Sequence, residues 1–193
     1  MKKYMHMLLF ALMAIVLTAC GGEEVETNMD APVADFEFTT QDGDTLSNDD
    51  LAGKWWVADF IFTNCETVCL PMTSNMAKLQ TKLAEEDLDD VQLVSFSVEP
   101  DRDTPEVLTE YADEYGADLS NWTFLTGYDF DTIKELSIHS FKNIVEAAPE
   151  GEDQITHGSY FFLVNPDGEV IKNYRGVETD EMDQIVKDVK NLQ

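Results

Sequence analysis

Two cysteines and one distant histidine are the residues of this chain whose types and spacing could carry chemistry. Cys65 and Cys69 stand four positions apart at the end of an apolar run, and His157 lies far downstream. A third cysteine, Cys20, belongs to the N-terminal leader and is considered below. Two thiols at this spacing can close into a disulfide, or hold a soft metal ion with an imidazole as third ligand. The function of the chain depends on which of these the pair does.

The N-terminal residues have the pattern of a secretory leader. Lys2 and Lys3 precede an apolar run over 7–17, and a Leu-Thr-Ala-Cys sequence then ends at Cys20, before two glycines. This pattern resembles a bacterial lipobox, which implies cleavage before Cys20 and attachment of a diacylglyceryl group to its sulfur. The alternatives are an ordinary signal peptide cut elsewhere, or an anchor helix that stays uncleaved. In each case the folded part lies outside the cytoplasm, where disulfides persist.

The pattern divides the chain into three parts. Residues 1–19 are expected to be a lipoprotein signal peptide, and 20–31 a lipid-anchored acidic tether, since 21–31 carry four acids and almost nothing apolar. Residues 32–193 are enough for one domain with a proper core, and no internal repeat interrupts them.

The charge of the chain excludes one class of partner. The formal net charge is −27, and removal of Lys2 and Lys3 with the leader makes it −29. Binding to nucleic acid needs basic patches, and the sequence has none. Because the acids are spread over nearly every polar segment, we interpret them as general surface charge rather than as a dedicated binding surface.

The residues around the cysteine pair predict a buried strand followed by a helix. Positions 55–62 are almost continuously apolar, as in a strand buried on both faces of a sheet. From Met72 onward, apolar residues recur at helical spacing. Cys69 therefore lies just before a helix or in its first turn, where free N–H groups and partial positive charge favour thiolate over thiol.

The other segments predict an α/β domain with a central sheet covered on both faces. The order of elements resembles the thioredoxin fold, with an added N-terminal β-hairpin as in its peroxiredoxin-like branch. The expected elements are a hairpin around Asp42-Gly43, a strand over 91–98, a helix from Thr104-Pro105, a strand over 123–125, a helix over 129–141, a hairpin of 159–164 with 170–174, and a helix from about 179.

The spacing of Cys65 and Cys69 leaves more than one interpretation open. Redox sites of the thioredoxin type have two residues between their cysteines, whereas this pair encloses three. The wider loop can still close into a redox-active disulfide, but it also lets both sulfurs face one ion. A purely structural disulfide is disfavoured, because so short a loop removes little entropy from the unfolded chain. The spacing favours a metal.

His157 is the candidate third ligand. It lies in a polar segment, 154–159, that we expect to be a loop, and in a thioredoxin-like sheet the corresponding loop approaches the cysteine-bearing turn. Two thiolates and an imidazole form a soft set suited to Cu(I) and able to hold Cu(II). A structural zinc site takes four ligands, and the usual iron–sulfur clusters need more cysteine. We therefore expect copper at Cys65, Cys69 and His157.

Four segments in combination point to a family. They are Phe62–Met72, Phe96–Pro105, Ile155–Gly158 and Asn165–Gly168. Together they resemble the Sco/SenC family, copper-binding proteins of the thioredoxin fold that help assemble the dinuclear copper centre of cytochrome c oxidase. The resemblance covers 32–192. It implies that the two cysteines and the histidine are copper ligands, and that the cysteines also cycle between dithiol and disulfide.

The cysteine loop departs from the family pattern. Many members have proline directly after the second cysteine and another within the loop, whereas this chain has Leu70 and Glu66 there, with proline at Pro71. The loop with glutamate resembles versions in Gram-positive bacteria, which also carry lipid anchors. The departure bears on the stiffness of the loop, and so on the balance between disulfide and metal.

Four other acidic or histidine residues are not expected to bind the metal. Asp101 and Asp103 match the acidic loop of the family, which implies a part in the approach of a partner, but they also suit a turn and a helix start. His139 suits the last turn of a helix, where an imidazole interacts well with the dipole, so we interpret it as structural or solvated. His6 lies in the leader.

The resemblance implies a copper chaperone, lipid-anchored at the extracytoplasmic face of the cell membrane, with the copper-bearing subunit of cytochrome c oxidase as its partner. Passing copper by ligand exchange needs no bond-making catalysis, so the chain need not be an enzyme. The alternative is a thiol–disulfide oxidoreductase that reduces the copper-site cysteines of the oxidase and has no need of His157. A peroxidase is more distant, because the expected catalytic threonine and arginine are not evident.

Overall fold

A computed structural model describes residues 25–65 and 67–193 of the protein. The expected signal peptide, Cys20, the first part of the expected tether and Glu66 lie outside the described residues. At the other end of the tether range, the backbone N–H groups of Asn28 and Met29 donate to the carbonyl of Ile171. None of the helices in the described ranges is both long enough and apolar enough to span a membrane.

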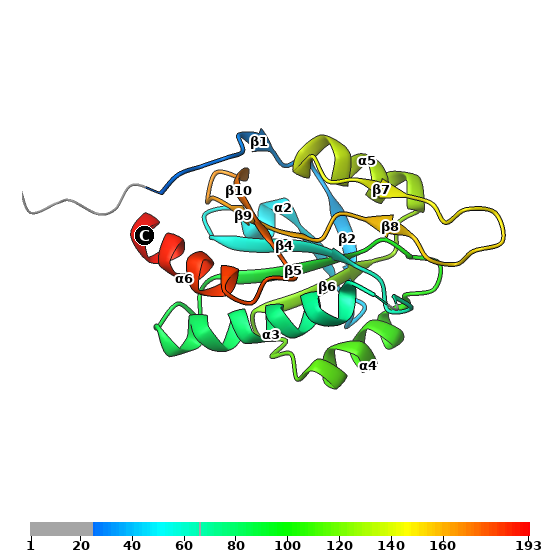
Figure 1. Ribbon diagram of the computed structural model, residues 1–193, viewed down its shortest axis with the longest axis horizontal. Helices are drawn as coiled ribbons and strands as arrows, with labels where there is room; N and C mark the ends of the chain where they lie inside the picture. Colours follow the sequence, from blue (N-terminus) through cyan, green and yellow to red (C-terminus); the bar gives the residue numbers. More distant parts are fainter. Residues whose placement is uncertain (1–24, 66) are drawn as a thin grey trace, which may run out of the picture.

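An eight-stranded sheet forms the centre of the domain (Figure 1). Its strand order is β1-β10-β9-β4-β5-β6-β2-β3, in which β4, β5 and β6 are parallel and the other pairings are antiparallel. The strands are β1 Ala31–Pro32, β2 Glu37–Thr40, β3 Thr45–Ser47, β4 Trp56–Ile61, β5 Gln92–Ser97, β6 Trp122–Thr126, β9 Tyr160–Val164 and β10 Glu169–Arg175. A separate ribbon joins β7 Val145–Glu146 to β8 Thr156–His157.

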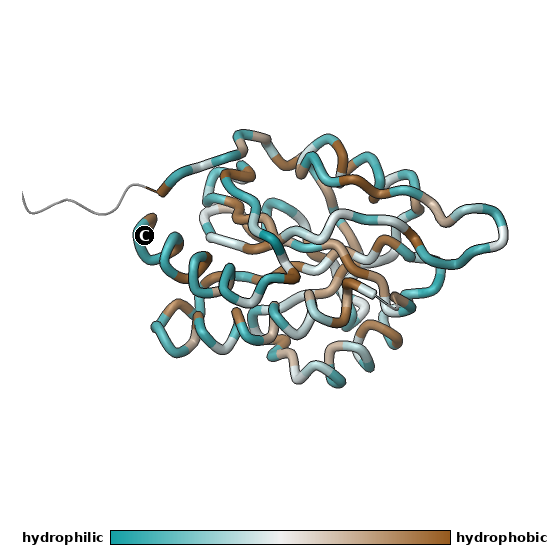
Figure 2. Tube along the Cα trace, viewed as in Figure 1, coloured by the Kyte–Doolittle hydropathy of each residue, from teal (hydrophilic) through white to brown (hydrophobic). Residues whose placement is uncertain are grey.

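Helices cover both faces of this sheet. In Figure 1, α3 (Cys69–Glu85), α4 (Pro105–Tyr115) and α6 (Glu181–Leu192) run along the lower side, and α5 (Phe130–Phe141) lies above. A single turn, α2 (Asn48–Leu51), follows the N-terminal hairpin. Each face has its own cluster of buried apolar side chains. In Figure 2 the outer loop between β7 and β8 is mostly teal, while brown segments gather in the interior.

β4 supplies side chains to both clusters, which explains its continuous apolar sequence. Val57 and Ile61 belong to the cluster under α3, whereas Trp56, Ala58 and Phe60 belong to the cluster under α5. Every residue of the strand is buried. Such two-sided burial is typical of a central parallel strand covered by helices.

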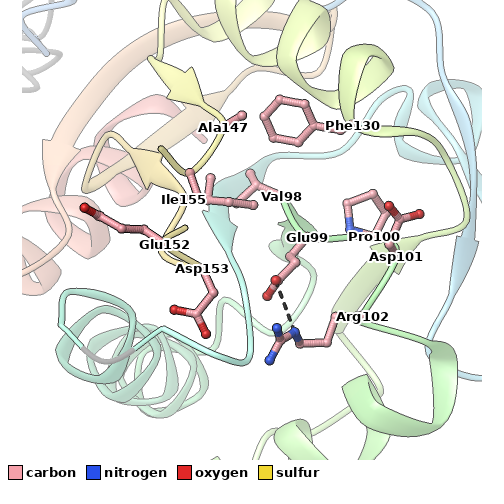
Figure 3. A pocket seen from close by; sticks show the side chains of 11 residues that line it. Val98, Glu99, Pro100, Asp101, Arg102, Phe130, Ala147, Glu152, Asp153 and Ile155 are labelled. Carbon is pink, nitrogen blue, oxygen red and sulfur yellow. Dashed lines mark ion pairs between the residues drawn. The ribbon is translucent and has the colours of Figure 1, made fainter. Parts of the chain in front are cut away.

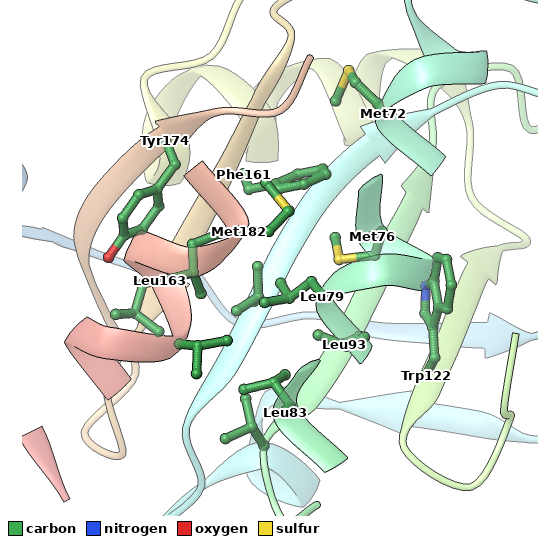
Figure 4. Close-up of a cluster of buried hydrophobic side chains, with 14 of the residues drawn as sticks. Met72, Met76, Leu79, Leu83, Leu93, Trp122, Phe161, Leu163, Tyr174 and Met182 are labelled. Atoms are coloured by element: carbon green, nitrogen blue, oxygen red, sulfur yellow. The ribbon is translucent and has the colours of Figure 1, made fainter. Parts of the chain in front are cut away.

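α3 is held against the sheet by its apolar face. Met72, Met76, Leu79 and Leu83 are fully buried and pack in the cluster shown in Figure 4. Burial of each such side chain contributes about 1.5–3 kcal/mol. The position of the first turn of α3, which begins at Cys69, is therefore fixed relative to β4.

The architecture confirms the expected α/β, thioredoxin-like fold with an added N-terminal hairpin, here β2 and β3. Thr104 and Asp129 cap α4 and α5 through their side chains, as their sequences indicate. One local expectation was wrong. His157 lies in β8 and pairs with Val145 of β7, so it is fixed by a short strand rather than carried by a loop.

Candidate metal centre

Cys65, Cys69 and His157 meet in one buried cluster. One ligand atom from each lies within 4.8 Å of the other two. The Sγ atom of Cys69 is 3.2 Å from Nε2 of His157, and both cysteines are free thiols. The three residues predicted as ligands from the sequence are thus brought together by the fold. Within the described ranges, this group of potential metal ligands has three members and no carboxylate.

The junction between β4 and α3 places the two sulfurs. The backbone N–H of Cys65 donates to the carbonyl of Phe62, which turns the chain at the end of β4. Cys69 is the first residue of α3, and its N–H donates to the sulfur of Cys65 at 3.4 Å. A free N–H at a helix N-terminus, with the partial positive charge found there, stabilises a thiolate.

His157 is oriented by its own backbone surroundings. Its Nδ1 lies 3.0 Å from the carbonyl oxygen of Gly158, which can only accept, so Nδ1 carries the proton and donates. Nε2, the ring nitrogen that remains for a metal, faces Cys69. The ring meets Phe62 edge-on, at 5.7 Å between centroids.

The two sulfurs share one proton. A hydrogen bond from the Cys69 thiol lowers the pKa of Cys65. Hydrogen bonds from His157 and nearby backbone N–H groups lower it further, whereas burial raises it. The same hydrogen bond to Cys65, together with burial, raises the pKa of Cys69. The reduced pair therefore consists of a thiolate at Cys65 and a thiol at Cys69, a nucleophile or ligand beside its proton donor.

A buried carboxylate anchors the turn that leads to Cys65. Asp103 is fully buried, and its oxygens accept from the hydroxyl groups of Thr63 and Ser97, each at 2.6 Å, as well as from the Thr63 backbone N–H. Burial raises the pKa of Asp103, and these hydrogen bonds oppose the rise. Asp103 thus has a structural role, although the helix start expected of it is taken by Thr104: it holds Thr63, which is two positions before Cys65.

A second set of contacts joins the cysteine turn to the segment that precedes His157. The side-chain amide of Asn64 donates to Asp153 at 3.1 Å, and the amide of Gln154 donates to the backbone carbonyl of Asn64 at 3.1 Å. Both loops that carry ligands are therefore tied to each other as well as to the sheet.

Asp59 is a residue near the centre that sequence analysis missed. It lies within the apolar run of β4, is fully buried, and neither carboxylate oxygen has a hydrogen-bond partner of normal geometry among the described residues. Burial raises its pKa to about 7, while the Ser95 hydroxyl and the electrostatic influence of His157 act in the opposite direction. The signal available in the sequence was one acid inside an otherwise apolar strand.

The remaining candidates lie apart from the cluster. His139 is exposed in the last turn of α5, which agrees with its interpretation as a solvated residue. Asp101 is exposed, and it lines a groove considered below.

Fold and centre together define a class: a thioredoxin-like protein whose redox position carries a buried dithiol beside an imidazole. Comparison with known proteins gives the family within this class. The family model SCO1/SenC matches residues 24–193, so the chain belongs to the SCO1/SenC family.

The relatives and solved structures agree with this assignment. The chain is 48% identical to the SCO1 protein homolog of Bacillus subtilis over 180 residues, 93% of this chain and 92% of that one. It is similar to a SCO1/SenC family lipoprotein from Bacillus anthracis (46% identity, TM-score 0.80, covering 84% and 95%) and to BsSco, a member of the Sco family of cytochrome c oxidase assembly proteins studied for a disulfide switch (48%, 0.78, 86% and 95%). Copper-bound ScoI of Arabidopsis thaliana is also similar (26%, 0.70, 83% and 99%).

The anchoring role of Asp103 predicts a matched pair of effects. Asp103→Ala should lower the free energy of unfolding by about 2–4 kcal/mol, because it leaves the hydroxyl protons of Thr63 and Ser97 without their acceptor. It should also speed alkylation of Cys65 by iodoacetamide severalfold in the reduced protein. Asp101→Ala, two positions away and exposed, should change the unfolding energy by less than about 0.5 kcal/mol. Equal effects in urea unfolding and alkylation would rule out the anchor.

Asp59 predicts a pH-dependent stability difference. Its pKa of about 7 in the folded protein exceeds the ordinary 3.8, so ionisation of Asp59 adds no cost to folding below about pH 4, and this cost grows as pH rises to about 7. Asp59→Asn carries no such titration. We expect the unfolding free energy of the unchanged protein, minus that of the variant, to fall by about 4 kcal/mol between pH 4 and pH 8 in urea titrations of the reduced, metal-free proteins. A difference that does not vary with pH would contradict the assignment.

Proposed function

We propose that this protein is a copper chaperone that assists assembly of the dinuclear copper centre of cytochrome c oxidase. The observation that carries the proposal is the buried cluster of two sulfurs and one imidazole, positioned by the junction of β4 with α3 and by β8. Cys65, Cys69 and His157 are the proposed copper ligands.

The chemistry of the donor set favours copper over other metals. Thiolate and imidazole ligands are soft or borderline, which suits Cu(I) and also allows a thiolate complex of Cu(II). Structural zinc sites close with four protein ligands, and the cluster in the described part of the chain offers three. Three ligands leave room for an incoming ligand from another protein, so the ion can be passed on by exchange, one ligand at a time.

The similar proteins support both copper binding and a role in assembly of cytochrome c oxidase. A solved structure of Arabidopsis ScoI holds copper, and BsSco is described as a member of a family of cytochrome c oxidase assembly proteins. The copper-bearing subunit of the oxidase is accordingly the proposed partner.

The location of the protein follows from its N-terminal sequence. We propose that residues 1–19 are a lipoprotein signal peptide, that Cys20 is lipidated, and that 20–31 form an acidic tether to the folded domain over 32–193, with the last residues of the tether paired to β10. The domain would then work at the extracytoplasmic face of the cell membrane. The similarity to a lipoprotein from Bacillus anthracis supports this arrangement.

One observation favours a second candidate function, a thiol–disulfide oxidoreductase that reduces the copper-site cysteines of the oxidase. The sulfurs of Cys65 and Cys69 lie together as a buried dithiol, and the opposite shifts of their pKa values favour a thiolate at Cys65 and a thiol at Cys69, as attack on a disulfide and closure of the pair require. This activity uses the same sulfurs and requires nothing of His157.

Ligand variants test the copper proposal. Cys65→Ala and Cys69→Ala should each weaken copper binding at least a thousandfold, and His157→Ala by about a hundredfold, because each loses a direct ligand to the ion. The measurement is a competition titration of the reduced, metal-free protein with a chelator of known copper affinity.

His139→Ala is the matched control, since it removes an exposed imidazole outside the cluster and should leave the affinity unchanged. Unchanged affinity in all three ligand variants would refute the proposed site. If His157→Ala binds copper poorly and still supports assembly of active oxidase in cells, the reductase replaces the chaperone as the proposed function.

A further inference from the structure

A groove of about 630 Å³ lies beside the metal centre. One wall is the loop 98–102 that follows β5, and the other is formed by residues of the 147–155 loop between β7 and β8 (Figure 3). Phe130 and Ile155, both half-buried, give the groove apolar surface. It is thus an open, partly apolar depression on a strongly acidic protein.

Both walls of the groove lead directly to metal ligands. The loop 98–102 runs into Asp103, which holds Thr63 next to the cysteine turn. On the other wall, Asp153 accepts from Asn64, the neighbour of Cys65, and Ile155 lies two positions before His157. A side chain seated in the groove would therefore lie against residues that are bonded or adjacent to both ligand-bearing segments.

The groove carries an excess of negative charge. Glu99, Asp101, Glu152 and Asp153 face a single cation, Arg102. Figure 3 shows the carboxylates of Glu99 and Asp153 and the guanidinium of Arg102 pointing toward one another. The lining therefore has a net formal charge of about −3 at neutral pH.

Glu99 has a binding capacity that the protein does not use. Nε of Arg102 bonds one of its oxygens, Oε1, at 3.1 Å. The other oxygen, Oε2, is buried and has no hydrogen-bond partner in the described ranges. Burial raises the pKa of Glu99, with further contributions from Asp103 and Asp153 and opposition from Arg102. Positive charge brought into the groove would stabilise the ionised form of this carboxylate electrostatically.

We propose that the groove is a docking site for a lysine or arginine side chain of the protein that exchanges copper with this chain. The inference rests on the proposed function. The apolar surface accommodates the methylene stem of such a side chain, and the carboxylates accept its charged end. A hydrated metal ion would gain nothing from the apolar wall, so a protein side chain fits the groove better.

Docking in this groove would bring a partner close to metal ligands that are buried. Cys65 is 6% exposed and Cys69 1%, so an acceptor must place its own ligand close to the sulfurs to take the ion. The general charge of −27 attracts a basic partner from a distance but does not orient it. An ion pair in a groove whose two walls adjoin the ligand-bearing segments fixes the orientation of the partner.

The test compares two variants that lose the same charge. Glu99→Gln with Asp101→Asn removes two negative charges from the groove, whereas Asp89→Asn with Asp90→Asn removes two from exposed acids just before the other end of β5. The measurement is the second-order rate constant for transfer of Cu(I) to the soluble copper-binding domain of the oxidase subunit, at low and high salt. Asp101→Asn alone serves as a milder version in case the double variant folds poorly.

We expect the groove variant to transfer copper at least tenfold more slowly at low salt, with a smaller difference at high salt because salt screens the ion pair. The control should lose less than twofold, and both variants should keep the copper affinity of the unchanged protein. Equal losses in the two variants, or no loss in either, would overturn the docking site.

Failure of the proposed function would look different. If the unchanged protein transfers no copper to the domain, the chaperone proposal fails whatever the variants do. The groove is then tested without copper, by adding the same domain to the isotopically labelled, metal-free protein and following its NMR signals. Shifts centred on 98–102 and 147–155 would support docking there, and binding elsewhere or none would refute it.

Discussion

The junction of β4 with α3 is the constraint on which the rest of the site depends. β4 is buried on both faces, so its end cannot move without disturbing two apolar clusters. α3 is fixed to the same sheet by buried side chains such as Met72 and Met76. Between them, the N–H of Cys69 reaches the sulfur of Cys65. A slide of the helix along the strand would separate the sulfurs, so packing far from the centre maintains the geometry of the ligands.

Burial then determines the chemistry of this junction. The sulfurs and the imidazole are removed from water, and the pair keeps a single proton, which a soft metal ion must displace to bind both sulfurs. Two acids share the interior with them in opposite ways. The hydrogen bonds of Asp103 support the turn before Cys65, whereas Asp59 remains without a partner of normal geometry in the described structure. An unpaired carboxyl in a central strand costs stability, which makes its place beside the centre a feature to be explained by function.

Much of the site could be predicted from local patterns. The apolar run before Cys65 and the helical repeat after Cys69 specify the strand-to-helix junction, because both signals are short-range. The resemblance to a family supplied the pairing of these sulfurs with His157, which no local pattern contains. The strand β8 was missed because two residues have no periodicity to detect. The roles of Asp103 and Asp59 were out of reach for a related reason, since an acid in the sequence does not show whether the fold gives it donors.

X-ray absorption at the copper edge, on the reduced full-length protein loaded with one equivalent of Cu(I), tests the central claim most directly. The spectrum reports the atoms bound to the ion. The structure predicts two sulfur neighbours and one nitrogen, with the nitrogen contribution lost in His157→Ala. A shell made of sulfur alone, or one that the His157 substitution leaves unchanged, would contradict the proposed centre.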